Sequence, residues 1–215
     1  MPEKDNTKAR IYRIAIALFK EKGFDNVTIR DICAASEVSK HTFYYYFESK
    51  DALLLGFHSM PENMEAAFLQ DVLAADSHFE QYMFLTSRVT NFFLDMGPEI
   101  SKRIISLNVN CKNDSLERIR KNKMRTLEID ILRKAQAAGE IRNSSNPDAL
   151  ISVCFGLLFS AIFHWCMGGG AYDLHDITRA ALENALDVRD DLRTGTSAVI
   201  WMHPHAAPAT SAPSI

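Results

Sequence analysis

Hydrophobic residues near the amino terminus recur with the period of an α-helix. Between residues 7 and 22 they form one apolar stripe, made of Ile11, Ile14, Ala15, Leu18 and Phe19. Polar and charged residues fill most of the intervening positions, and Gly23 supplies a stop signal after the stripe. The pattern predicts an amphipathic first helix with one face toward a core.

Capping residues divide the next stretch into short helices. Thr28 precedes an apolar segment, and Asp31 three positions later resembles the second half of a capping box. Ser39 stands before a second short helix, and Ser49 stands before a further helical segment. We therefore predict a head of three helices over residues 1–52, with the next helix opening at its end.

Helical periodicity continues through most of the remaining chain, and no alternating strand pattern competes with it. The predicted helical segments are 59–73, 78–96, 98–108, 114–138, 147–167 and 173–190. We predict an all-α protein in which a larger helical body, residues 53–190, follows the head. Residues 191–215, rich in Ala, Pro, Ser and Thr, are expected to form a disordered tail.

Composition adds limits on function. The chain has 47% hydrophobic residues, as ordinary globular proteins do, and a formal net charge of -3, so any DNA-binding surface has to be a local patch. The four cysteines are scattered and no secretory signal precedes the polar start, which predicts a reduced, cytoplasmic protein. Phosphate loops, nucleophile elbows and metal-binding spacings do not occur, so we expect no enzyme activity, no metal and no cofactor.

The stretch from residue 28 to 53 has the spacing of a helix-turn-helix. Its apolar residues suit a small core that holds two helices across a short turn: Ile29, Ile32, Val38, Phe43 and Phe47. The second helix then keeps one outward face, which carries Lys40, His41, Thr42, Tyr44 and Tyr45. A cation, hydroxyls and aromatic rings in that arrangement suit phosphate oxygens, base edges and thymine methyl groups in a major groove.

The same stretch resembles the signature of the TetR family of bacterial regulators. The matching residues are Phe19-Lys-Glu-Lys-Gly-Phe, Val27-Thr-Ile-Arg-Asp-Ile, Val38-Ser-Lys, Thr42-Phe-Tyr-Tyr-Tyr-Phe and Ser49-Lys-Asp-Ala-Leu. The resemblance implies a transcriptional regulator, usually a repressor, that binds a palindromic operator as a homodimer and is released by a small-molecule effector. It also implies the residues that meet double-stranded DNA, which are Thr28, Ser39, Lys40, His41, Thr42, Tyr44, Tyr45 and Lys50.

Two positions depart from the family pattern. Glu37 occupies a turn position where relatives usually have Gly, and since positive φ is uncommon for other residues, we expect a strained or reshaped turn. His41 stands where a small residue is frequent, and whether it reads a base or rests on the sugar-phosphate backbone stays open. We assign Phe43, Tyr46 and Phe47 to the core.

An uncharged stretch covers residues 149–172 and is long enough to span a bilayer. A membrane span, a core helix and a helix packed on a partner subunit are the alternatives, and we favour the last because no basic cluster flanks the stretch. The helix after it would complete a four-helix bundle across a two-fold axis. The expected dimer interface consists of Leu157, Ala161, Ile162, Trp165, Ile177, Ala181, Leu182 and Ala185.

The family resemblance further implies an effector pocket enclosed by the middle helices. The candidate lining residues are Phe79, Tyr82, Met83, Arg88, Asn91, Phe92, Asn108, Cys111, Phe155, Phe159 and His164. Nothing in the sequence identifies the effector. The alternative function is a helical interaction protein whose helix-turn-helix no longer binds DNA, and the salt dependence of DNA retention would separate the two.

Overall fold

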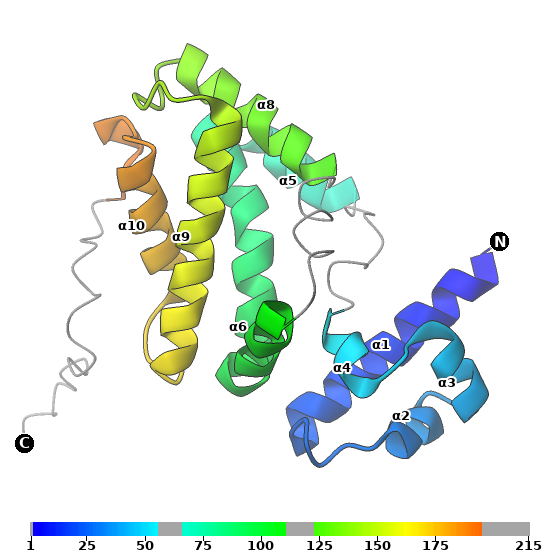
Figure 1. Ribbon diagram of the computed structural model, residues 1–215. Helices are drawn as coiled ribbons and strands as arrows, with labels where there is room; N and C mark the ends of the chain where they lie inside the picture. The colour runs from blue at the N-terminus through cyan, green and yellow to red at the C-terminus, as the bar shows by residue number, and fades with distance from the viewer. Residues whose placement is uncertain (1, 56–65, 111–122, 195–215) are drawn as a thin grey trace, which may run out of the picture.

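The computed structural model describes residues 2–55, 66–110 and 123–194. In these ranges the chain is built from α-helices, with one isolated β-bridge between Ile141 and Val188 and a 3₁₀ turn at Asp190–Leu192. The all-α fold class is thereby confirmed. Figure 1 shows a head at one end and a larger helical body beside it.

The head contains four helices. They are α1 (Pro2–Lys22), α2 (Ile29–Ala35), α3 (Lys40–Tyr46) and α4 (Lys50–Leu55). Their starts follow the predicted caps, since the side chain of Thr28 accepts from the Asp31 N–H and that of Ser39 accepts from the Thr42 N–H. The hydroxyl of Ser49 likewise accepts from the backbone N–H of Ala52, at 3.0 Å.

The body contains five helices in its described part. They are α5 (Ala66–Ala74), α6 (His78–Asn110), α8 (Lys123–Ala137), α9 (Pro147–Met167) and α10 (Leu174–Ala185). Helix α6 runs through the middle, with α9 packed on it, α10 beside α9, and α8 across the upper end (Figure 1). The predicted segments at 59–73 and 114–138 lie partly outside the described residues.

Helix α6 is divided by a break at Gly97, whose φ of 73° and ψ of 164° are not helical. Pro98 follows, where it can begin a helix because it needs no N–H partner there. The two segments predicted at 78–96 and 98–108 therefore exist, joined at one kink. The kink matters for the site because residues on both sides of it contact the head, Asp95 before it and Arg103 after it.

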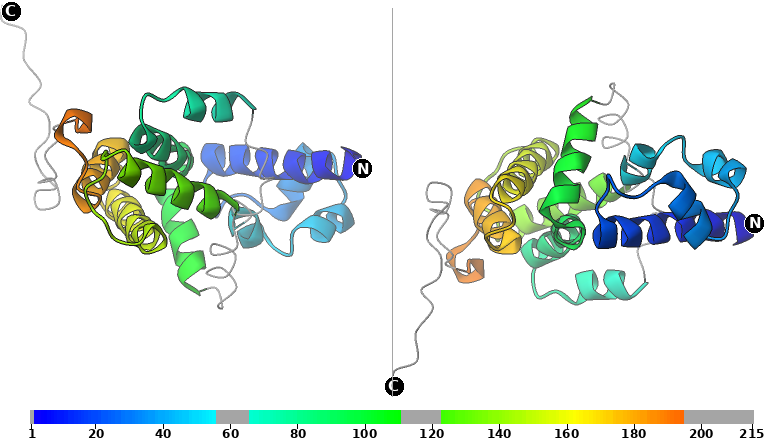
Figure 2. Two further views of the ribbon diagram at one scale, coloured as in Figure 1. Left: turned by 90° about the horizontal axis from the view of Figure 1, so that it is seen from above. Right: turned by 90° about the horizontal axis from the view of Figure 1, so that it is seen from below.

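Head and body share one hydrophobic cluster. Phe19 and Leu53 of the head belong to the same buried cluster as Ile104 of α6 and Trp165 of α9. Two ion pairs border this contact: Lys20 with Asp95 at 2.5 Å, and Arg103 with Asp51 at 3.0 Å. Figure 2 shows α1 running into the body with its carboxyl-terminal end beside α6.

The last helix ends earlier than the pattern predicts. We expected it to reach residue 190, but α10 ends at Ala185 because Asp187 adopts a positive φ of 49°. The N–H groups of Asp187 and Val188 donate to the carbonyls of Asn184 and Glu183, which is a Schellman arrangement that closes the helix. Val188 then turns back to pair with Ile141.

Candidate nucleic-acid interface

Helices α2 and α3 pack around the small core that the sequence predicts. Ile32 and Phe43 are fully buried and Phe47 is 5% exposed, while Ile29 and Val38 pack against the same cluster. Tyr46 is half-buried against that cluster, so its assignment to the core is only partly met. Because the apolar side chains hold the two helices from within, the rest of α3 faces outward.

The turn between the two helices has the backbone that the sequence predicts. Glu37 has a φ of 53°, and the N–H groups of Glu37 and Val38 donate to the carbonyls of Ala34 and Cys33. This is the Schellman arrangement, in which the left-handed position is usually occupied by glycine. A glutamate therefore holds a conformation that costs an ordinary L-residue about 1–2 kcal/mol.

The outward face of α3 presents aromatic and polar side chains to solvent. Tyr44 is 53% exposed and Tyr45 is 63% exposed, and Lys40 and His41 are also exposed. Edge-on contacts orient both tyrosine rings, that of Tyr44 against Phe43 and that of Tyr45 against Tyr46. This face of α3 therefore offers two adjacent aromatic rings to a binding partner.

Three of the predicted DNA-contacting residues, Thr28, Ser39 and Thr42, make hydrogen bonds at helix caps. The Thr28 N–H and hydroxyl both donate to the Asp31 carboxylate, at 2.8 and 2.6 Å, and these hydrogen bonds lower the pKa of Asp31. The Ser39 hydroxyl lies 2.9 Å from that of Thr42. The contacts of these three residues with DNA stay predictions, with their side chains held at two helix starts.

Lys50 is held inside the head. Its ammonium donates to the backbone carbonyls of Phe24 and Val27, at 2.6 and 2.8 Å, and lies 4.2 Å from the centroid of the Phe24 ring. The sequence predicted a phosphate contact for Lys50. In this structure its charge instead fixes the loop between α1 and α2 to the start of α4.

A comparison with known protein families identifies the family of this head. Residues 11–56 match the family model described as bacterial regulatory proteins of the tetR family. The match covers the second half of α1, the helix-turn-helix and α4. The chain belongs to the TetR family. As a member of this family it is a transcriptional regulator with a DNA-binding helix-turn-helix.

Relatives resemble this TetR-family chain over most of its length. A probable acrEF/envCD operon repressor of Escherichia coli K12 is 24% identical over 189 residues, which cover 84% of this chain and 85% of the relative. Two solved structures share the fold. The regulator FadR of Bacillus subtilis, in complex with stearoyl-CoA, has a TM-score of 0.62 at 19% identity and covers 83% of this chain and 97% of its own.

The second structure is FadR of Thermus thermophilus, in complex with lauroyl-CoA. It has a TM-score of 0.60 at 20% identity, and the match covers 84% of this chain and 91% of the neighbour. At this level of identity the two neighbours show the fold alone, which consists of the head and a helical body with long central helices. Their ligands are properties of those proteins.

Burial within the body contradicts most of the predicted dimer interface. Ala161, Ile162, Trp165, Ile177 and Leu182 are all at most 6% exposed inside the single chain, so they cannot face a partner without unpacking. Leu157, Ala181 and Ala185 are half-buried, and their place at an interface stays a prediction. The exposed apolar residues of α9 are Val153, Phe155, Phe163 and Met167, at 52%, 39%, 44% and 67% exposure.

Helix α9 also meets the length and hydropathy of a membrane span. Its mean hydropathy is 2.0 over the most apolar stretch, and 44% of that stretch is buried inside the protein. Core helices of soluble proteins satisfy the same criteria. One side of this helix packs on α6, α8 and α10, and the other side exposes large apolar side chains, those of Val153, Phe155, Phe163 and Met167.

The predicted pocket residues do not converge on one cavity. Phe79 and Tyr82 are closed into a second hydrophobic cluster, against which Met83 packs. The other predicted residues lie apart from one another. The Arg88 guanidinium lies over the Phe68 ring, and the Asn108 amide donates to a carbonyl of its own helix. Phe92 is half-buried, His164 and Phe155 are exposed, Phe159 stacks on Phe155, and Cys111 lies outside the described residues. The expectation of a single pocket lined by all of them is therefore wrong for this structure.

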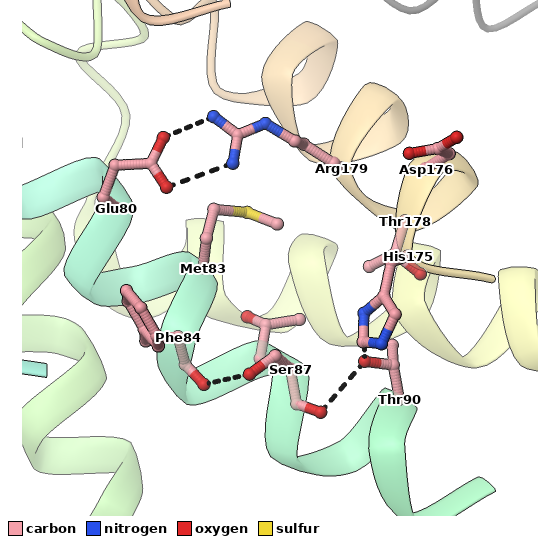
Figure 3. Close-up of a pocket in the computed structure, with 10 residues that line it drawn as sticks. Glu80, Met83, Phe84, Ser87, Thr90, His175, Asp176, Thr178 and Arg179 are labelled. Atoms are coloured by element: carbon pink, nitrogen blue, oxygen red, sulfur yellow. Dashed lines mark hydrogen bonds and ion pairs between the residues drawn. The ribbon is translucent and has the colours of Figure 1, made fainter. Parts of the chain in front are cut away.

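A cleft does open elsewhere on the body, between the first half of α6 and α10 (Figure 3). It has a volume of about 210 Å³ and is lined by Glu80, Met83, Phe84, Thr86, Ser87, Thr90, His175, Asp176, Thr178 and Arg179. Met83 is the one residue shared with the predicted pocket. Sequence reasoning missed the others because the two walls lie far apart in the chain, as His175 and Thr90 do, and their meeting follows from packing alone.

Proposed function

We propose that this TetR-family regulator represses transcription by binding a palindromic operator as a homodimer, and that a small-molecule effector bound in the body releases it. The single observation that carries the proposal is the outward face of α3, where Tyr44 and Tyr45 are exposed over a well-packed head. Its action is binding rather than catalysis, in the cytoplasm where bacterial DNA lies.

Reading of DNA is assigned to α3 and to the caps beside it. Lys40, His41 and Tyr44 would enter the major groove, while Tyr45 and the starts of α2 and α3 would meet phosphates. Helix N-termini suit phosphate because they present N–H groups and a positive dipole end. This supports DNA binding by a chain whose formal net charge is -3.

Dimerisation is assigned to the exposed apolar face of α9, defined by Val153, Phe155, Phe163 and Met167. Exposed Gly156 lies among them and would permit close approach of a second helix. A two-fold axis through this face would pair α9 and α10 of two subunits in a four-helix bundle. The two α3 helices would then be separated by about 34 Å, one turn of DNA.

Regulation is assigned to α6, which contacts both parts of the protein. Its second half carries Arg103, paired with Asp51 of α4, while Asp95 next to the kink pairs with Lys20 of α1. A ligand that shifts α6 would therefore move the head and alter the spacing of the two reading helices. The acyl-CoA complexes of the two FadR neighbours support a ligand-binding body of this kind.

The proposal is tested by DNA binding. A site is first selected from random duplex DNA with the wild-type protein, and Kd is then measured by fluorescence anisotropy. Tyr44→Ala and Lys40→Ala should each weaken binding about ten-fold or more, because a good contact to a base or phosphate contributes about 1–3 kcal/mol. Their thermal midpoints should stay close to that of the wild type, since both side chains are exposed.

Lys134→Ala, at an exposed position of α8, is the matched control and should leave Kd unchanged. The logarithm of Kd should also rise steeply with the logarithm of salt concentration, because bound phosphates release counterions. Unchanged affinity in both head variants, or a flat salt dependence, would overturn the proposal. That result would favour an interaction protein with an inactive helix-turn-helix.

A further inference from the structure

The cleft between α6 and α10 holds a buried hydroxyl that lacks a partner. Thr178 lines the cleft, is 2% exposed, and its Oγ makes no hydrogen bond with any described residue. A buried hydroxyl without a partner costs about 1–3 kcal/mol, so such groups are rare in folded proteins. The hydroxyl of Thr178 is therefore available to a ligand in the cleft.

The other hydroxyls of the cleft have lone pairs to offer and no free protons. Thr86 and Ser87 donate to carbonyls of their own helix, at 3.0 and 2.7 Å, and the single proton of Thr90 lies between the Ser87 carbonyl and His175 Nδ1, each 3.0 Å away. The proton of each is thus committed, and the oxygen remains an acceptor. His175 adds no free group, because its two ring nitrogens contact Thr90 Oγ at 3.0 Å and Asn91 Oδ1 at 2.8 Å.

Negative charge exceeds positive charge around the cleft. The one arginine of the lining, Arg179, is largely engaged, since four of its five N–H groups donate, two to the oxygens of Glu80, one to Glu183 and one to the carbonyl of Leu192. These hydrogen bonds, first of all that to Glu80, raise the pKa of Arg179. The carboxylate of Asp176 has no ion-pair or hydrogen-bond partner among the described residues.

Apolar groups complete the wall. Figure 3 shows Met83 between the Arg179–Glu80 pair and His175, with Phe84 beside it. Phe84 is 41% exposed, so its ring offers a surface for an apolar ligand body. A volume of about 210 Å³ lies below the roughly 300–1,000 Å³ of pockets that hold drug-sized ligands, so the cleft suits a small molecule.

We propose that the α6–α10 cleft binds a small organic cation, an amine with N–H donors and a short apolar body. Its ammonium would donate to the hydroxyl oxygens of Thr178 and of the α6 wall, with the Asp176 carboxylate supplying the negative charge, and its apolar body would lie on Met83 and Phe84. An anion would meet a surplus of carboxylates and an arginine already bound to Glu80 and Glu183. The binding step stands apart from transcription; only the claim that such an amine alters operator affinity would rest on the proposed function.

The test uses the full chain and isothermal titration calorimetry with benzylamine hydrochloride at constant ionic strength. Benzyl alcohol and sodium phenylacetate serve as probes of the same size without the positive charge. Benzylamine should bind, and both comparison probes should bind at least ten-fold more weakly. Binding of phenylacetate or benzyl alcohol as tight as that of benzylamine would overturn the proposal.

Two variants locate the amine. Thr178→Val removes the unpartnered hydroxyl while keeping the shape of the side chain, and Asp176→Asn removes the free charge at an exposed position. Each should weaken benzylamine binding about five-fold or more, and Thr178→Val should fold with an equal or higher thermal midpoint because no hydrogen bond is lost. Thr126→Val, at an exposed position of α8, is the matched control.

Benzylamine binding that neither variant weakens, in folded protein, would remove the amine from this cleft. Operator affinity is measured separately by anisotropy. Absence of operator binding in the wild type would overturn the proposed function and leave the amine site unaffected. Absence of benzylamine binding would overturn the amine site and leave the proposed function unaffected.

Discussion

At the scale of single residues, the turn of the helix-turn-helix contains one residue with a strained backbone conformation. Glu37 has a φ of 53° at the position of a Schellman motif where glycine is favoured. Replacement by glycine removes a conformational cost of about 1–2 kcal/mol and adds about 0.5–1 kcal/mol of unfolded-state entropy. We therefore expect Glu37→Gly to raise the free energy of unfolding by about 0.5–1 kcal/mol, measured by urea denaturation.

Glu48→Gly is the control for this turn. Glu48 is also an exposed glutamate in the head, but its φ is not positive, so glycine there gains nothing and should lower stability. A Glu37→Gly protein no more stable than the wild type would mean that the turn is relaxed in solution. The sequence alone identified this position, because the spacing of the two caps located the turn.

A second residue gives the stability a pH dependence. Glu128 of α8 has its pKa raised from 4.5 to about 7, first by burial, against a smaller lowering by Arg125. Below pH 4.5 the carboxyl is protonated in both the folded and the unfolded chain, so folding carries no penalty. As the pH rises from 4.5 to 7 the unfolded chain releases the proton first, and the free energy of unfolding falls.

We expect Glu128→Gln to remove this fall. A pKa of about 7 in the folded chain against 4.5 in the unfolded chain corresponds to about 3 kcal/mol, and residual solvent contact reduces this to on the order of 2 kcal/mol. Relative to the wild type, the variant should therefore gain stability between pH 5 and pH 7 and keep the gain at pH 8, in urea titrations at one protein concentration. Glu21→Gln, at an exposed position of α1, should run parallel to the wild type.

At the scale of helices, the sequence predicted the elements well and their faces less well. Caps and stop signals are local, so the starts of α2, α3, α9 and α10 agree with the pattern to within a residue. The end of α10 was placed too late because Asp187, unlike glycine, gives no signal of a left-handed turn. Local chemistry is visible in a sequence only where the residue type announces it.

For helix α9 the sequence could not tell the buried face from the exposed face. Apolar residues surround it, so periodicity offers no contrast between the face toward the core and the face toward a partner. Phe155, predicted for a pocket, is 39% exposed, while Trp165, predicted for an interface, is 4% exposed. The choice depends on where α6 and α8 lie, and that packing joins segments far apart in the sequence. For the same reason the α6–α10 cleft could not be predicted.

At the scale of the whole molecule, the uncovered face of α9 predicts self-association. Val153, Phe155, Phe163 and Met167 together expose an apolar surface that a stable monomer seldom leaves open. Light scattering of the wild type at micromolar concentration should give about twice the chain mass of 24.2 kDa. Phe163→Lys should shift the measured mass toward one chain, because a charge in the centre of the buried interface would lack a partner.

Leu73→Lys is the matched control for this variant. Leu73 is 76% exposed on α5, so it offers an equally large apolar side chain away from α9, and its replacement should leave the dimer mass unchanged. Operator affinity should fall with the dimer, because each half-site would then be bound without the partner head. A Phe163→Lys protein that remains dimeric and binds operator normally would place the two-fold axis on another surface, and the spacing of the α3 helices would have to be derived from that surface instead.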